Sequence, residues 1–127
     1  MENFENLKEK SRKWREWYYD GEPQLNPVAE SVKEAFDLIN ATLFGHIYQR
    51  PKLDIKIRSL CTIAALTVLD KPKQLPGHIT GALNSGASKE EIIELITQML
   101  FYGGYPAVVN SLDAASNTFN EYEKKHS

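Results

Sequence analysis

Apolar residues recur along this chain at steps of three and four, the period of an amphipathic α-helix. No stretch alternates cleanly with a period of two, as a half-buried strand would. The pattern therefore predicts an all-α protein of about six helices, packed as a bundle. The apolar positions that set this period on the first two expected helices are Phe4, Leu7, Trp14, Tyr18, Val28, Val32, Phe36, Ile39 and Leu43.

Local signals predict where the first two helices end and begin. The first helix should stop near residues 20–21, an aspartate followed by a glycine. Asn26 and Pro27 are typical of an N-cap and a first helical position, so the second helix should start there. Gly45 and Pro51 then interrupt the pattern.

The third helix is expected to begin at Asp54, as its cap, and to run to about Leu69. Residues 60–66 within it are apolar on nearly every face, so we predict that this is the buried central helix. Cys61 lies in this run and is expected to be an inert, small apolar residue.

The second half of the chain carries clear start and stop signals. A proline and a glycine at 76–77 predict a bend or a new helix start. Ser88, with Glu91 three residues later, fits a capping box, and the glycines at 103–104 should end the helix that follows. The inward positions expected beyond residue 88 are Ile92, Leu95, Ile96, Met99, Leu100, Val108, Leu112, Ala115 and Phe119. The polar residues 123–126 are expected to form a frayed tail.

Length and composition favour one globular domain, residues 1–127, with an N-terminal helix and loop over residues 1–25. Fifteen basic and 17 acidic residues give a net charge of −2, which supplies no broad basic field for nucleic acid. No window approaches the roughly 20 apolar residues of a membrane span, and the charged N-terminus does not resemble a secretory signal. We therefore expect a cytoplasmic protein with neither a nucleic-acid nor a membrane partner.

A single cysteine limits the available chemistry. Cys61 alone provides no internal disulfide, no CxxC redox pair and no cysteine-based zinc cluster. Catalysis, if present, must then use acid–base and electrostatic groups. Arg58 and His78 are the candidates, since an imidazole exchanges protons near neutral pH and a guanidinium binds carboxylates through two hydrogen bonds. Spacing alone favours the structural alternative, an arginine in an ion pair and a satisfied core histidine.

Five segments in a fixed order change that balance. They are FGHIYQRP at 44–51, LDIKIRSL at 53–60, HITGALNSG at 78–86, EEIIE at 90–94 and YGGYPA at 102–107. Together, over residues 44–119, they resemble the carboxymuconolactone decarboxylase family. The resemblance implies an all-α fold that assembles into homotrimers or homohexamers, with pockets between helices of neighbouring protomers. It also favours His78 and Arg58 as catalytic residues.

One branch of that family, the alkyl hydroperoxidase D-like proteins, reduces peroxides with two cysteines and a proton-relay glutamate. The positions that match these three residues hold Lys71, Gln74 and Ser59 in this chain. Without a thiolate there is neither a nucleophile for peroxide nor a resolving partner. A dithiol peroxidase is therefore disfavoured as the alternative function.

The decarboxylase branch implies a lyase acting on a small carboxylated lactone or a related acid, with no metal or organic cofactor. Its type reaction converts 4-carboxymuconolactone to an enol-lactone and carbon dioxide, and the electron pair left behind spreads into the lactone as a dienolate. Arg58 would hold a substrate carboxylate. His78 would donate to the developing oxyanion or reprotonate carbon.

Further residues are candidates for substrate binding, each with a structural alternative. His46 stands where typical decarboxylases carry an acidic residue, and it also suits a helix-end histidine that interacts with the helix dipole. Gln98, Tyr102 and Tyr105 would line the pocket and donate hydrogen bonds, although tyrosines beside a Gly-Gly stop commonly serve packing.

Two expectations concern partners. The aromatic residues at 14 and 17–19 are interleaved with both basic and acidic residues, so we expect them to contact another subunit rather than nucleic acid. The rival to an enzyme is a non-catalytic oligomer that binds a small metabolite, in which replacement of His78 would leave ligand affinity intact.

Overall fold

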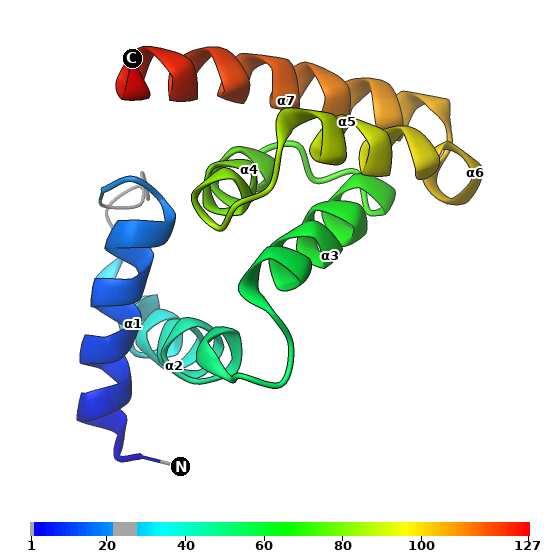
Figure 1. Cartoon of the computed structure of the whole chain (residues 1–127). Coiled ribbons are helices and arrows are strands. Elements are labelled where there is room, and N and C mark those ends of the chain that lie inside the picture. Colours follow the sequence, from blue (N-terminus) through cyan, green and yellow to red (C-terminus); the bar gives the residue numbers. More distant parts are fainter. Residues whose placement is uncertain (1, 22–27) are drawn as a thin grey trace. The chain divides into compact units, whose positions relative to one another are not determined.

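A computed structural model of the chain describes residues 2–21 and 28–127. Every regular element in these residues is helical, and none is a strand, which confirms the predicted all-α class (Figure 1). The elements are α1 (Phe4–Tyr18), η1 (Glu30–Val32), α2 (Lys33–Gly45), η2 (Ile47–Gln49), α3 (Ile55–Val68), α4 (Leu75–Asn84), α5 (Lys89–Gln98), α6 (Leu100–Gly103) and α7 (Tyr105–His126). The chain divides into two compact units, residues 1–54 and 55–127.

In the first unit, α1 packs along α2. The side chain of Asn3 caps α1 by accepting a hydrogen bond from the backbone N–H of Asn6 at 2.9 Å. The two helices approach so closely at Gly45 that a Cβ there would lie 2.3 Å from the carbonyl oxygen of Leu7. Glycine at this position therefore permits the contact.

Aromatic rings pack together between α1, α2 and η2. Trp14 stacks on Tyr18 with a centroid separation of 4.6 Å and on Phe44 at 5.7 Å. Tyr48 meets Phe44 edge to face at 5.3 Å. Of the aromatic residues at 14 and 17–19 that were expected to contact another subunit, Tyr18 is instead buried within the chain itself, whereas Trp17 is 46% exposed. Aromatic pairs of this kind stabilise a small core beyond the area that they bury.

In the second unit, α3, α4 and α5 pack against the long helix α7. Its core consists of residues from these helices and the loop before α5: Ile63, Leu75, Ile79, Ala82, Ala87, Ile92, Ile96, Val108, Ala115 and Phe119. The inward positions expected on α7 are confirmed, with Leu112 packed against this core. On the α5–α6 segment, Leu100 is the exception, because it is exposed.

Several predicted helix ends are confirmed. The helix α4 begins at Leu75 with Pro76 in its first turn, so the proline starts the helix rather than interrupting it. Ser88 and Glu91 form the complete capping box of α5. Gly104, at φ 90°, ends α6, but the helix that follows Ser88 already ends at Gln98, so the glycines do not end α5 as predicted.

The predicted frayed tail is wrong, because α7 stays helical to His126. Tyr122 stacks on the imidazole of His126 at 4.0 Å and donates a hydrogen bond to Asn84 on α4 at 2.8 Å. Lys89 also pairs with Glu123. These contacts hold the last turns in place although their sequence is polar.

Two predicted apolar faces are not buried in this chain. On α2, Ile39 and Leu43 are exposed, while the residues buried there include Ala41 and Phe44. The predicted central helix α3 buries only one narrow face, and its Cys61 is exposed rather than enclosed. The spacing of apolar residues predicts that α2 and α3 are helices. It does not predict whether another element covers the apolar face of each helix.

Two further expectations concern the start of the second helix and membrane-spanning helices. The predicted cap and helix start at residues 26–27 lie outside the described residues. Over residues 2–21 and 28–127, no helix has both the length and the apolar character that crossing a bilayer requires.

Candidate functional site

His78 is the fourth residue of α4, one turn from the helix start that Pro76 sets. Its side chain is largely withdrawn from water, and this burial lowers the pKa of the imidazole from 6.5 to about 4. At neutral pH the ring is therefore uncharged. A neutral imidazole offers one N–H donor and one nitrogen acceptor.

Arg58 is the fourth residue of α3, and it is partly buried. The helices α3 and α4 pack against each other, so Arg58 and His78 lie on neighbouring helices of the same unit. The structure thus places a guanidinium on one helix and a neutral imidazole on the next.

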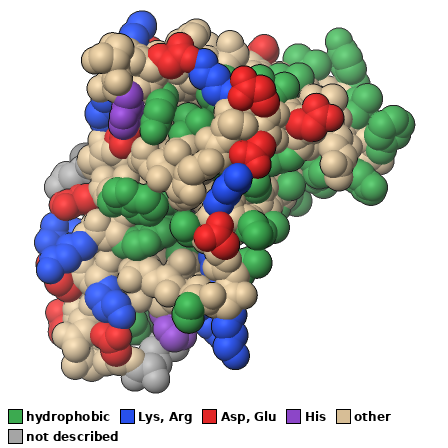
Figure 2. Space-filling view, viewed as in Figure 1, with side chains coloured by type: hydrophobic (Ala, Val, Ile, Leu, Met, Phe, Trp, Pro, Cys, Tyr) green, Lys and Arg blue, Asp and Glu red, His purple; other side chains and the backbone are tan. Residues whose placement is uncertain are grey.

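Gln98, Tyr102 and Tyr105 gather where α5, α6 and α7 meet. In the single chain they are open to solvent: Tyr102 is 71% exposed, Tyr105 is 73% exposed, and Phe101 beside them is 88% exposed. Figure 2 shows this apolar corner at the α6 end of the molecule. We call these residues, with Leu100, the α6 corner. Whether its polar groups reach a substrate stays a prediction.

His46 follows α2 as its C-cap and belongs to the first unit, with its backbone N–H bonded to the carbonyl of Thr42. The helix-end position is the one that the structural alternative gives, but that alternative expected a solvent-exposed side chain. Its side chain is partly buried.

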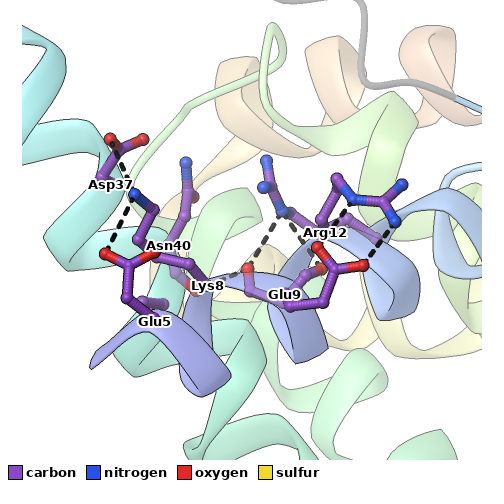
Figure 3. Close-up of a pocket in the computed structure, with 9 residues that line it drawn as sticks. Glu5, Lys8, Glu9, Arg12, Asp37 and Asn40 are labelled. Carbon is purple, nitrogen blue, oxygen red and sulfur yellow. Dashed lines mark hydrogen bonds and ion pairs between the residues drawn. The ribbon is translucent and has the colours of Figure 1, made fainter. Parts of the chain in front are cut away.

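Sequence reasoning missed a polar groove between α1 and α2. It has a volume of about 230 Å³ and is lined by residues from both helices, among them Lys8, Arg15, Asp37 and Asn40 (Figure 3). The signal was present, since Lys8, Ser11 and Arg15 recur at helical spacing on one face of α1. From the sequence, Arg15 is instead interpreted as part of a mixed-charge surface around the aromatic residues.

Within residues 2–21 and 28–127, no three His, Cys, Asp or Glu side chains come together as a metal site would require.

A family model and two named relatives all indicate the same protein family. The family model for the "Carboxymuconolactone decarboxylase family" matches residues 33–117. The chain is 30% identical to a 4-carboxymuconolactone decarboxylase of Acinetobacter baylyi, over 80% of this chain and 78% of that protein. It is 32% identical to the nitrosuccinic acid decarboxylase npaB of Metarhizium robertsii, over 82% of this chain and 73% of the relative.

A third relative carries no activity in its name. It is an uncharacterized 15.0 kDa protein of Paracoccus denitrificans, 41% identical over 65% of this chain. The match spans 63% of that relative's length.

Proposed function

The chain belongs to the carboxymuconolactone decarboxylase family, and from that premise we propose that it is a cofactor-free decarboxylase of a small acid. The proposed substrate carries two carboxylates and an electron-withdrawing group next to the one that leaves. Two relatives support this class, since the names of both describe decarboxylases of acids with such a group, a lactone in one and a nitro group in the other.

The observation that carries the proposal is the placement of Arg58 and His78. Both lie inside the matched region, residues 33–117, on helices that pack against each other. A decarboxylation needs a group to orient the acid and a group to stabilise the electron pair left on carbon. These two side chains supply one of each.

Arg58 is proposed to bind the carboxylate that the product keeps. Carbon dioxide is uncharged, so a cation paired with the departing carboxylate would stabilise the substrate more than the transition state. A guanidinium on the retained carboxylate holds substrate and transition state alike through two hydrogen bonds. Its contribution should therefore appear mainly as binding.

His78 is proposed to act at the developing negative charge. The bond between carbon and the leaving carboxylate breaks, carbon dioxide departs, and the electron pair moves onto the oxygen of the electron-withdrawing group. A neutral imidazole donates its N–H to that oxygen, and a proton then returns to carbon. Burial of His78 strengthens such a hydrogen bond, because the surroundings are less polarisable than water.

The assembly is proposed to be a homotrimer or homohexamer. Gln98, Tyr102 and Tyr105 can line a desolvated pocket only if something covers the α6 corner, because they are open to solvent in one chain. A neighbouring protomer would provide that cover. We also propose that the protein acts in the cytoplasm, on a free small-molecule carboxylate.

The proposal is tested by carbon dioxide release from 4-carboxymuconolactone and from nitrosuccinic acid, each with the purified full chain. We expect release from at least one of the two above the uncatalysed rate. Background rates with both acids, together with saturable binding of either, would support the non-catalytic binding protein instead.

A further inference from the structure

The groove between α1 and α2 contains an arginine whose charge is incompletely paired. The Nε of Arg15 donates to Ser11, at 3.1 Å to the hydroxyl and 3.3 Å to the backbone carbonyl. Among residues 2–21 and 28–127, Arg15 forms no ion pair within 4.0 Å of a carboxylate. Among these residues, no hydrogen bond engages its two terminal nitrogens.

This arginine lines the groove and is oriented by Ser11. The hydroxyl of Ser11, which is 1% exposed, accepts from Arg15 and donates to the backbone carbonyl of Asn40 on α2 at 2.9 Å. Arg15 itself is partly buried, and this burial lowers the pKa of its guanidinium below the ordinary value, opposed by Tyr19 and Asp37. A cation fixed and partly desolvated in this way gains from meeting an anion.

The other charges of the groove differ in how fully they are engaged. Arg12 is saturated by Glu9 at 2.6 Å and Glu16 at 2.7 Å. Lys8, by contrast, lies 3.7 Å from Glu5 and 3.9 Å from Asp37, beyond hydrogen-bond distance (Figure 3). Lys8 and Arg15 therefore form no hydrogen bond to a carboxylate among the described residues, although Lys8 stays within ion-pair distance of Glu5 and Asp37.

Asp37 offsets this pair of cations only in part. Its carboxylate already accepts a hydrogen bond from Lys33 at 3.0 Å, on its own helix. The other carboxylate near Lys8, that of Glu5, is 81% exposed, so solvent screens its charge.

We propose that the groove between α1 and α2 binds a small carboxylate anion, held by the guanidinium of Arg15 and the ammonium of Lys8. The carboxylate would accept two parallel hydrogen bonds from Arg15, while the Asn40 amide at the groove wall offers a further donor. At about 230 Å³ the groove suits a small acid rather than a drug-sized ligand. The site shares no residue with Arg58 or His78.

The test is a titration of the full chain with succinate, followed by backbone amide chemical shifts, against sodium chloride at equal ionic strength. Saturable shifts at Ser11, Arg15 and Asn40 with succinate alone are expected. Shifts confined to residues around His78, or equal shifts with chloride, would overturn the proposal. So would saturation by phosphate without any response to succinate.

Variants separate a binding site from a charged surface. Arg15→Gln should weaken succinate binding about tenfold or more. Lys13→Gln, which removes an exposed cation of α1 outside the groove, should change it less than about twofold.

Asp37→Asn distinguishes anion binding from a structural role of the groove, because only anion binding predicts a higher affinity for succinate in this variant. It removes a negative charge facing the groove and should strengthen succinate binding by roughly two- to fivefold. Unchanged affinity in Arg15→Gln, or weaker binding in Asp37→Asn with the fold intact, would contradict the assignment. A change in oligomeric mass without a change in affinity would assign Arg15 to a protein contact instead.

Discussion

At the scale of single residues, His78 is defined by its neutral imidazole. Its pKa in the folded chain, about 4, lies below the ordinary 6.5, so the unfolded chain binds more protons between these values. Stability from this group is therefore complete above about pH 6.5 and is lost as the pH falls toward 4. Between pH 7 and pH 4.5 the loss should be about 2 kcal/mol.

Denaturant unfolding at the two pH values measures this loss, with His78→Gln as the reference because other groups titrate in the same range. The wild-type chain should lose about 2 kcal/mol more than the variant. Equal losses in the two proteins would mean that His78 is not withdrawn from water.

The sequence made Arg58 and His78 candidate site residues because they stand in segments with a recognisable order. It did not identify Arg15, since nothing in an isolated helix shows that Ser11 will be buried against the Asn40 carbonyl of another helix. Nor did it reveal the low pKa of His78. That pKa depends on what packs over the ring.

At the scale of helices, the sequence predicts helix ends that depend only on residues close together in the chain. Ser88 and Glu91 are three residues apart, and the capping box they form needs no distant partner. Pro76 likewise starts α4 through its own fixed φ and missing N–H. The apolar face of α2 and the exposed side of α3 were misjudged, because burial requires a covering element that the pattern does not name.

Ser88 provides a direct test of α5. Its hydroxyl accepts from the N–H of Glu91 at 3.0 Å, so Ser88→Ala should lower the free energy of unfolding by about 1 kcal/mol. Ser116→Ala, at an exposed position within α7, should be neutral or slightly stabilising, because alanine is the better helix former. Equal losses in urea unfolding would show that the cap contributes nothing specific.

At the scale of the whole molecule, the α6 corner leads to a prediction about assembly. Phe101, Tyr102 and Tyr105 place large apolar rings in solvent, and exposed apolar patches of this kind mark interaction sites. We expect the native mass in light scattering to equal three or six chains. Phe101→Asp should lower that mass, because a charge would have to be buried in the contact.

Asn120→Asp is the matched control, as it adds the same charge at an exposed position of α7. It should leave the mass unchanged. A wild-type mass of one chain would remove the proposed cover of the α6 corner and with it the subunit-bridging pocket.

Arg58 is proposed to bind the substrate and His78 to stabilise the developing negative charge. Steady-state carbon dioxide release measures these two roles separately, as KM and kcat. With the substrate that the wild type accepts, His78→Gln should lower kcat about 100-fold or more, and Arg58→Gln should raise KM about tenfold or more. Lys56→Gln, on the same helix as Arg58 but paired with Glu91 at 2.9 Å, should change neither. Wild-type kcat and KM in both the His78 and Arg58 variants would contradict the proposed site.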